Sequence, residues 1–298
     1  MGDEGIFDAL LSAEDEHWAF GTGFDDPLSG LDLAVPEGID AAALAAYCLM
    51  LGDDALVWGH RMSEWCSNAP DLEDDIALAN ISLDLIGQAR LLLMRAAAAD
   101  PGVVPPLPPG SPAPPEDRLA FFRDAEQFRN VRLAELPNGD FGQAVAQLLV
   151  MATWRTAILR RLRESVDPVL AAIAAKGLKE ARYHQEYAAR WFVTLALGTD
   201  ESRRRLADGY AVLLPYTEEL FRTHPIETRL PGIAVEAAEV RDEVSIVLDA
   251  VFADSTLDRP EWQQTTGGVG RDGTHTEALS RMLAEMQSVA RAHPLGAW

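Results

Sequence analysis

The sequence predicts an all-α protein built around a bundle of long antiparallel helices. From Ile39 onward the apolar residues follow helical spacing, and no stretch of useful length alternates apolar and polar residues as a half-buried strand does. Proline, glycine and asparagine interrupt this pattern at only a few places, so the segments between the interruptions are long. Helices of such length suit a bundle and do not suit a globin-like packing of short elements.

Four of the predicted helices are about 26–30 residues long, which corresponds to about 40 Å each. Asp71 follows Pro70 at the start of the second helix, and Asp167 with Pro168 gives the fourth an N-cap followed by proline at the first helical position. Gly198 suits the C-terminal cap of the fourth helix. Short connections join the first helix to the second and the third to the fourth, which makes each pair antiparallel. The four helices are predicted at residues 40–67, 70–99, 140–166 and 167–197.

One long connection separates the two helix pairs. Residues 101–115 contain eight prolines in fifteen positions, which excludes a helix or a central strand and predicts a polyproline-like surface connection. A helix is predicted over residues 117–135, before the turn sequence Pro137-Asn138-Gly139. Two pairs of long helices joined by a single long crossover have the ferritin-like topology.

The C-terminal third is predicted to add further helices to this bundle. They cover residues 200–222, with a kink at Pro215, and residues 235–254. A glycine- and threonine-rich loop over 265–273 precedes the last helix, which a capping box of Thr274 and Glu277 is expected to open.

The predicted organisation is one ferritin-like helical domain over residues 39–298, preceded by an acidic N-terminal arm over residues 1–38. The apolar residues of the arm are too sparse for a core, which favours a disordered tail. The alternative is an arm that becomes ordered on a partner.

Charge excludes several classes of partner. Asp and Glu number 47 and Lys and Arg 25, giving a net charge of −22, which repels the phosphates of nucleic acids and anionic lipids. No apolar run approaches the roughly 18–20 residues of a membrane span. The first Lys or Arg is Arg61, after thirteen acidic residues, so secretory and mitochondrial presequences are excluded and a cytoplasmic location is expected.

The two cysteines fit a reducing compartment. Cys48 and Cys66 are expected on the same helix, about 27 Å apart along one face. That separation excludes an intrachain disulfide and predicts two buried free thiols.

A ferritin-like dinuclear metal site takes carboxylates from four helices, two of which carry Glu-x-x-His. The first helix offers Glu64, the second Asp84, and the last Glu180 with His184. The second helix has Gly87 where the histidine would stand, and His184 follows Glu180 by four residues, a spacing that can still share a face. The helix at 140–166 has no carboxylate and no histidine between residues 141 and 163. We therefore interpret these as degenerate ligand positions and expect no metal in this chain.

Two interpretations of the same residues remain. A single metal ion is one, because two histidines with carboxylates form a recognised iron ligand set; its ligands would be His60, Glu64, Asp84, Glu180 and His184. The favoured one is a polar network inside the bundle, because buried charges must be paired. In that network the acids would pair with Arg61, Arg90, Lys179 or Arg182.

Eight segments, in order along residues 40–298, resemble the C-type subunits of bacterial ring 1,2-phenylacetyl-CoA epoxidases, the multicomponent oxygenases of phenylacetate degradation. The longest is LEDDIALANISLDLIGQAR at 72–90, and another is KEARYH at 179–184. The acidic arm lies outside the resemblance. The segments are residues 47–56, 61–66, 72–90, 128–130, 136–141, 179–184, 275–277 and 283–287.

The resemblance implies a ferritin-like, non-catalytic structural subunit that pairs with an iron-bearing A-type subunit and supports it. It implies that the A-type partner holds the di-iron centre and the CoA thioester, and that an NADPH-dependent reductase supplies electrons. The assembly would epoxidise the aromatic ring of phenylacetyl-CoA. This chain would then contribute no catalytic residue and no cofactor.

Two other functions are weighed against this one. A metal-dependent oxygenase in its own right would need a carboxylate near the middle of the helix at 140–166. A CoA-thioester-binding scaffold would need an apolar pocket, and the arginines at 203–205 could then contact a CoA phosphate, although a solvated helix start explains them more simply.

Residues 72–90 mix acids with aliphatic residues over five helical turns and are the candidate for part of a partner interface, with Glu73, Asp74 and Asp75 as its charged members. Ordinary bundle core plus a solvated face is the alternative.

Overall fold

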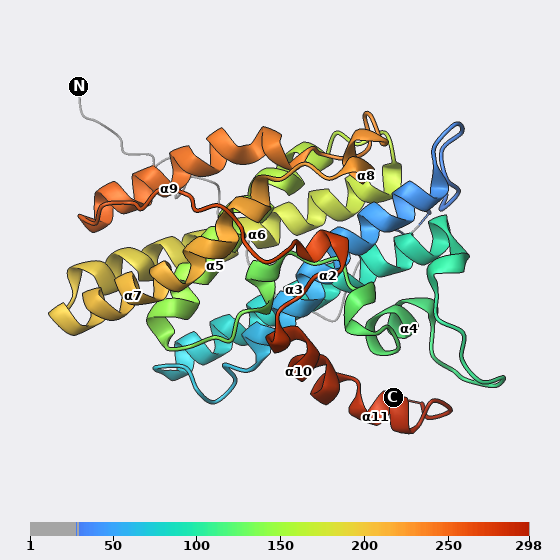
Figure 1. The fold of residues 1–298 in the computed structure, drawn as a ribbon, viewed down its shortest axis with the longest axis horizontal. Coiled ribbons are helices and arrows are strands. Elements are labelled where there is room, and N and C mark those ends of the chain that lie inside the picture. Colours follow the sequence, from blue (N-terminus) through green and yellow to red (C-terminus); the bar gives the residue numbers. More distant parts are fainter. Residues whose placement is uncertain (1–27, 29, 298) are drawn as a thin grey trace.

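The computed structural model describes residue 28 and residues 30–297, so most of the predicted acidic arm lies outside the described residues. Within the described part every regular element is an α-helix or a 3₁₀ helix. The prediction of an all-α protein is confirmed, and Figure 1 shows the elongated bundle that the helices form.

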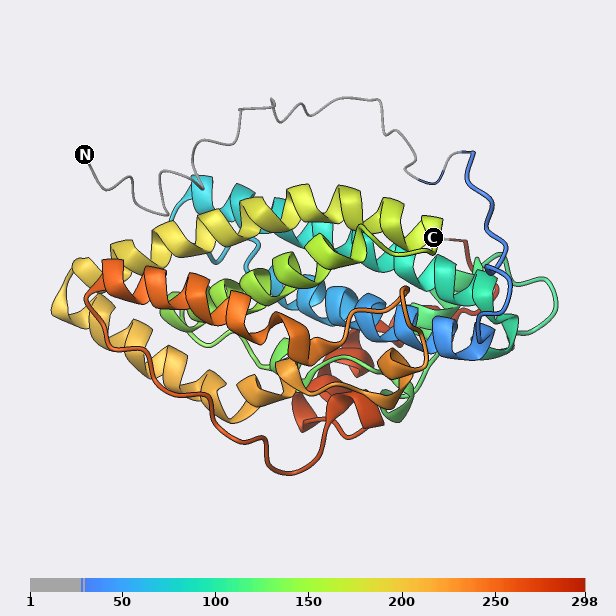
Figure 2. The same ribbon diagram turned by 90° about the horizontal axis from the view of Figure 1, so that it is seen from above.

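Four long helices form the bundle, and they run side by side in both views (Figures 1 and 2). Helix α2 packs along α3 and α5 packs along α6, as two antiparallel pairs, and α3 meets α6 between the pairs. This arrangement is the predicted ferritin-like one. The four helices are α2 (Ala41–Ser63), α3 (Leu72–Ala99), α5 (Phe141–Leu162) and α6 (Pro168–Leu197).

An aspartate caps the N-terminus of each long helix. Its carboxylate accepts a hydrogen bond from the backbone N–H three residues later, which satisfies one of the donors left free at a helix start. Asp71 and Asp167 cap α3 and α6 as predicted, and Pro168 occupies the first turn of α6. The four bonds join Asp40 to Ala43 (3.0 Å), Asp71 to Asp74 (2.9 Å), Asp140 to Gln143 (3.0 Å) and Asp167 to Leu170 (2.8 Å).

Glycines permit two close helix approaches. A Cβ at Gly59 of α2 would lie 3.1 Å from Leu85 Cβ of α3, so α2 passes α3 very closely at this level. A Cβ at Gly209 of α7 (Asp200–Thr217) would lie 2.5 Å from Gln143 Cα of α5. A side chain at either position would push the helices apart.

The crossover differs from the prediction. Instead of one helix over 117–135, the chain forms α4 (Pro115–Phe121) and two short 3₁₀ turns, Ala125–Gln127 and Arg132–Glu135. The reason is tertiary: the Arg123 side chain and the backbone N–H of Arg129 both donate to the buried Asp53 carboxylate of α2. These bonds draw the chain across α2 and override its helical tendency. The proline-rich segment forms only a 3₁₀ turn at Pro101–Val103 and irregular structure.

The C-terminal third wraps the bundle. Helix α7 and α9 (Arg241–Ser255) flank α5 and α6, and α10 (Glu277–Met286) and α11 (Ser288–Ala292) lie on the other side near α4 (Figures 1 and 2). Pro215 lies in the last turn of α7, which continues as a 3₁₀ helix at Glu218–Phe221. The short connecting elements are α8 (Pro225–Thr228) and 3₁₀ helices at Ala237–Val240 and Gly270–Asp272.

Two local predictions were wrong. Thr276, not Thr274, is the N-cap of α10, and its hydroxyl donates to Glu135 Oε2 (2.7 Å) instead of forming a capping box. Cys66 lies beyond the end of α2 and is exposed, because α2 ends at Ser63. Cys48 is a buried free thiol as predicted, and burial raises its pKa.

Two helices, α2 and α3, are long and apolar enough to cross a membrane by length and composition alone. Within the bundle 83% of the relevant window of α2 and 44% of that of α3 are buried. The core helices of water-soluble proteins meet the same criteria, so the two helices are only a weak indication of a membrane span.

Candidate functional site

A polar pair links α3 to α6 in the interior of the bundle. His184 is fully buried, and its Nε2 lies 3.0 Å from Asp84 Oδ2. Burial lowers the pKa of His184, although the Asp84 carboxylate opposes that effect. The ring is therefore neutral at neutral pH, with its Nε2–H donating to Asp84. The structure thus brings together two of the predicted positions.

Glu180 lies beside this pair on α6. Gln88 of α3 donates from Nε2 to Glu180 Oε2 (2.7 Å), and Lys176 Nζ lies 3.8 Å from Glu180 Oε1. Burial and the neighbouring Asp84 carboxylate raise the pKa of Glu180 to about 7. The Asp84 carboxylate thus opposes the ionisation of Glu180.

Helix α5 contributes a cation to this region. The buried Arg155 donates from Nε to Gln88 Oε1 (2.7 Å) and from Nη1 to the Leu51 carbonyl of α2 (3.5 Å). Burial lowers the pKa of Arg155 to about 10, while the carboxylates of Asp54 and Glu180 act to raise it. A pKa of about 10 leaves the guanidinium charged at neutral pH.

The polar network predicted for these acids is confirmed in one pair, Arg61 with Glu64 (2.7 Å). Arg90 lies 3.6 Å from Glu116 instead, and the prediction did not include Arg155. Arg155 could have been found, since it is the one charged residue in the apolar stretch from 144 to 159.

Glu64 and His60 lie outside the central group. Glu64 caps the C-terminal end of α2, where it accepts from Arg61 Nη1 (2.7 Å) and Asn138 Nδ2 (3.1 Å). Burial lowers the pKa of His60, and the charges that act on it are those of Glu64, Arg61 and Glu285 of α10. The five-residue set proposed for a single metal is therefore not assembled, which corrects the inclusion of Glu64 among the central positions.

The residues present do not fit the dinuclear metal of ferritin-like oxygenases. In the part of the chain that the structure describes, no group of three or more His, Cys, Asp and Glu side chains could hold a metal ion. Helix α5 has no carboxylate and contributes the guanidinium of Arg155, whose positive charge acts on Glu180 and His184 and opposes the binding of a cation beside them.

A second set of buried charges was missed by the sequence analysis. Arg95–Asp167 joins α3 to the N-cap of α6, the other pairs join the bundle to a surrounding segment or join two such segments, and all are almost fully buried. The two residues of each pair lie far apart in the sequence, so no local sequence pattern predicts the pairs. The pairs are Asp53–Arg123, Asp54–Arg271, Arg95–Asp167, Arg132–Glu219 and Glu135–His275.

Helix α3 carries an exposed aliphatic stripe. The side chains of Leu72, Ile76, Leu83 and Ile86 are 68%, 50%, 64% and 39% exposed. At 100° per residue these four positions lie within about 80° of the helix circumference, so they form one face. We call this face the α3 stripe. Exposed aliphatic residues aligned on one helix are a common mark of a protein interaction site.

The three acids at the start of α3 do not form one charged surface. Glu73 is exposed and Asp75 accepts a hydrogen bond from the backbone of Ser67 (2.6 Å). Asp74 is buried, and its Oδ1 accepts from Tyr187 Oη and Trp191 Nε1 of α6, both at 2.7 Å. Asp74 thus links α3 to α6 within this chain. Its prediction as a residue of the partner interface is therefore corrected.

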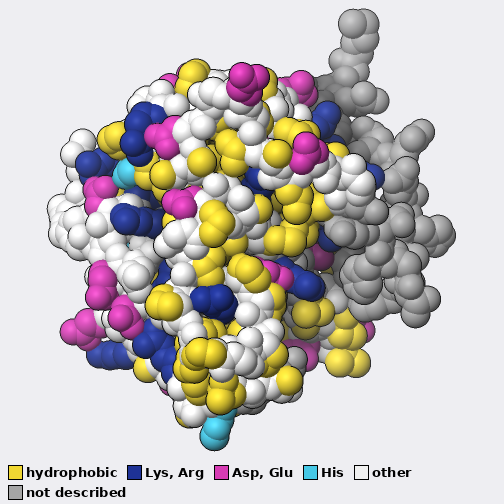
Figure 3. Space-filling view, turned by 90° about the vertical axis from the view of Figure 1, so that its right-hand side faces the viewer, with side chains coloured by type: hydrophobic (Ala, Val, Ile, Leu, Met, Phe, Trp, Pro, Cys, Tyr) yellow, Lys and Arg dark blue, Asp and Glu magenta, His cyan; other side chains and the backbone are white. Residues whose placement is uncertain are grey.

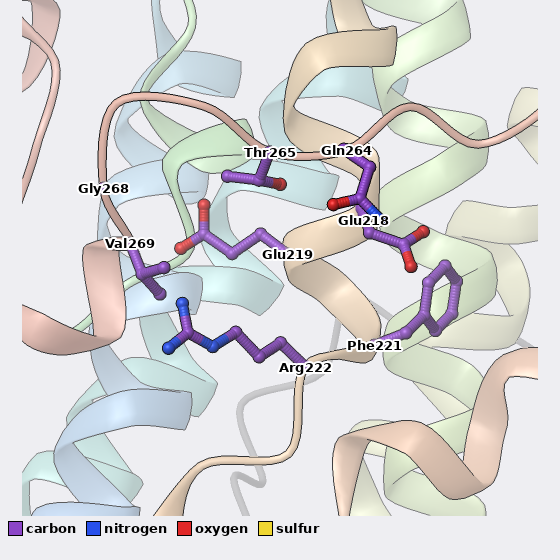
Figure 4. A pocket seen from close by; sticks show the side chains of 8 residues that line it. All are labelled: Glu218, Glu219, Phe221, Arg222, Gln264, Thr265, Gly268 and Val269. Carbon is purple, nitrogen blue, oxygen red and sulfur yellow. The ribbon is translucent and has the colours of Figure 1, made fainter.

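No built acyl-CoA site is evident among the described residues. A cavity of about 440 Å³ lies between the 3₁₀ helix at Glu218–Phe221 and the loop at 264–269, and Figure 4 shows that mainly polar side chains line it. The three arginines that open α7 are engaged: Arg203 donates to the Thr256 carbonyl, and Arg204 and Arg205 pair with Glu201. At the end of the bundle that faces the viewer in Figure 3, basic, acidic and hydrophobic side chains are mixed.

Comparison with known proteins finds a matching family and a similar protein. A family model described as phenylacetic acid catabolic protein matches residues 35–298. A relative from Escherichia coli (strain K12), the C-type subunit of 1,2-phenylacetyl-CoA epoxidase, is 43% identical over 258 residues, which is 86% of this chain and 99% of the relative. The family match begins after most of the acidic arm.

Proposed function

The chain belongs to the family of phenylacetic acid catabolic proteins, and we propose that it serves as a non-catalytic structural subunit of a phenylacetyl-CoA 1,2-epoxidase in aerobic phenylacetate catabolism. The resemblance to C-type subunits is confirmed by the similarity to the C-type subunit from E. coli. In this proposal the chain pairs with an A-type subunit that carries the di-iron centre, and an NADPH-dependent reductase completes the assembly in the cytoplasm.

The observation that carries the non-catalytic role is the composition of the bundle centre. Helix α5 brings Arg155 to the region where an oxygenase of this fold needs a metal-binding carboxylate, and Glu64 lies at the far end of α2. An oxygenase in its own right would need a carboxylate on α5 and a ligand on α2 that reaches the centre of the bundle. The pairing of a neutral His184 with Asp84 holds α3 and α6 together.

The α3 stripe supports the pairing with a larger partner. A subunit with the same helix geometry can lay a helix along this face, and stable interfaces of this kind commonly bury more than about 2,000 Å² in total. Exposed Glu73 and partly exposed Asp75 would stand at one end of the interface, where basic partner residues complement them.

The test is co-purification of this chain with a tagged A-type subunit. Leu83→Glu places a charge in the α3 stripe, and we expect it to reduce recovery of the complex at least tenfold. Ile246→Glu is the matched control, because Ile246 on α9 is 61% exposed, against 64% for Leu83. Both variants should keep the thermal stability of the isolated chain.

Unchanged recovery with Leu83→Glu, or equal loss with both variants, would contradict the proposed surface. The charge component is tested by Glu73→Lys with Asp75→Lys, leaving Asp74 intact because its substitution would break the bonds to Tyr187 and Trp191. Failure of the unsubstituted chain to associate with any A-type subunit would contradict the proposed role itself.

A further inference from the structure

We propose that Arg155 is a permanent internal cation that joins the helices of the four-helix bundle at the level where other ferritin-like proteins use metal ions. This inference concerns the core of the chain alone and does not depend on the proposed pairing with another subunit. It assigns a structural role to Arg155.

Arg155 contacts two of the other three bundle helices directly and is connected to the third through Gln88. From α5 its Nη1 donates to the Leu51 carbonyl of α2 (3.5 Å), and its Nε donates to Gln88 Oε1 of α3 (2.7 Å). Gln88 links Arg155 to α6, because its Nε2 donates to Glu180 Oε2 (2.7 Å). A bridging metal joins helices in the same way, through one cation that several side chains share.

Gln88 is suited to this relay. Its amide offers an acceptor oxygen to the guanidinium and a donor nitrogen to the carboxylate, so one side chain satisfies both. Gln88 is 3% exposed, and a Cβ at Gly177 of α6 would lie 3.1 Å from its Cδ atom. The missing side chain at Gly177 leaves the room that the amide occupies.

The charge balance also points to Arg155. Asp54 already pairs with Arg271 (2.7 Å), whereas the cation at ion-pair distance from Glu180 is Lys176, at 3.8 Å and 40% exposed. Arg155 reaches Glu180 through Gln88, and its charge favours the ionised form of Glu180. An arginine 2% exposed needs compensating negative charge, because burial of an isolated charge costs several kcal/mol. The guanidinium of Arg155 therefore offsets part of the negative charge that Asp54 and Glu180 place in the centre of the bundle.

The test compares melting temperatures of the full-length chain and four variants. Arg155→Met removes the charge and keeps most of the side-chain volume, and we expect it to lower the melting temperature by roughly 6–12 °C. Adding Glu180→Gln removes the carboxylate left without its cation, and we expect it to restore roughly 3 °C or more of that loss. Arg155→Lys keeps the charge and should fall between the unsubstituted chain and Arg155→Met.

Arg160→Met is the matched control. Arg160 lies on the same helix, is 47% exposed and pairs with Glu243 at the surface, so its loss should change the melting temperature by less than about 2 °C. The inference is overturned if Arg155→Met behaves like this control, or if Glu180→Gln restores nothing. If Arg155→Met does not fold, Arg155→Lys decides: a folded lysine variant supports the internal cation, and an unfolded one overturns it.

Discussion

Loss of the Arg271 side chain should release the C-terminal loop from the bundle and destabilise the whole chain. Arg271 is 7% and Asp54 1% exposed, and the two form a bidentate pair with distances of 3.0 and 2.7 Å. Arg271 Nη1 also donates to the carbonyls of Met50 and Arg129, both at 2.7 Å. One side chain thus joins α2, the crossover and the C-terminal loop.

The magnitude follows from what Arg271→Met leaves behind. Asp54 would keep only the hydrogen bond from the Val131 backbone (2.8 Å) and would remain buried. Removing one partner of a buried ion pair costs about 3–5 kcal/mol, a large part of the roughly 5–15 kcal/mol that holds a typical protein folded. At about 2–3 °C per kcal/mol in a chain of this size, the melting temperature should fall by roughly 6–15 °C.

The assay is thermal unfolding followed by circular dichroism, with limited proteolysis to locate the loosened segment. Cleavage should appear first in the loop at 256–275. Arg281→Met is the control, because the Arg281–Glu277 pair is 78% and 87% exposed and its loss should shift the midpoint by less than about 2 °C. Asp54→Asn added to Arg271→Met should recover part of the loss. The reasoning is refuted if Arg271→Met matches the control, or if Asp54→Asn makes the loss worse.

Three further outcomes are expected. Burial lowers the pKa of His275, but the Glu135 carboxylate and the Phe128 carbonyl outweigh burial and raise the pKa overall. The stability that protonated His275 contributes is complete below about pH 6.5 and is lost as pH rises through the raised pKa. The melting-temperature difference between the unsubstituted chain and His275→Gln should therefore narrow from about pH 6 to pH 9. Burial and Asp84 raise the pKa of Glu180 to about 7, so folding favours its neutral form. The unsubstituted chain therefore loses stability as pH rises from about 4.5 through 7, and Glu180→Gln should gain stability relative to it between pH 5 and pH 8. Parallel pH profiles of the two proteins would contradict this. A thiol reagent should modify exposed Cys66 in the native chain and reach buried Cys48 only after unfolding; equal rates would contradict the burial of Cys48.

The long helices could be predicted because local and tertiary preferences agree there. Asp71 and Asp167 are good caps in any context, and their bonds to Asp74 and Leu170 are local. The crossover could not be predicted, because its course is set by Asp53, which lies 70 residues from Arg123. Thr276 was missed as the start of α10 for the same reason, since its hydroxyl binds distant Glu135.

The candidate site could be predicted in part. Asp84 and His184 come together because both face inward from neighbouring long helices, which helical spacing indicates. Glu64 was placed wrongly because α2 ends at Ser63, and a boundary error of a few residues moves a side chain out of the core. Arg155 was missed because a search for metal ligands passes over a cation, although a lone arginine in an apolar stretch needs a buried partner.

The central claim is that this chain holds no catalytic metal, and iron content tests it most directly. The full-length chain, purified alone from iron-rich cells, should contain close to zero iron per chain by elemental analysis, and Glu180→Ala and His184→Ala should not change that value. Stoichiometric iron that is lost in either variant would contradict the account and would make this chain a catalytic subunit.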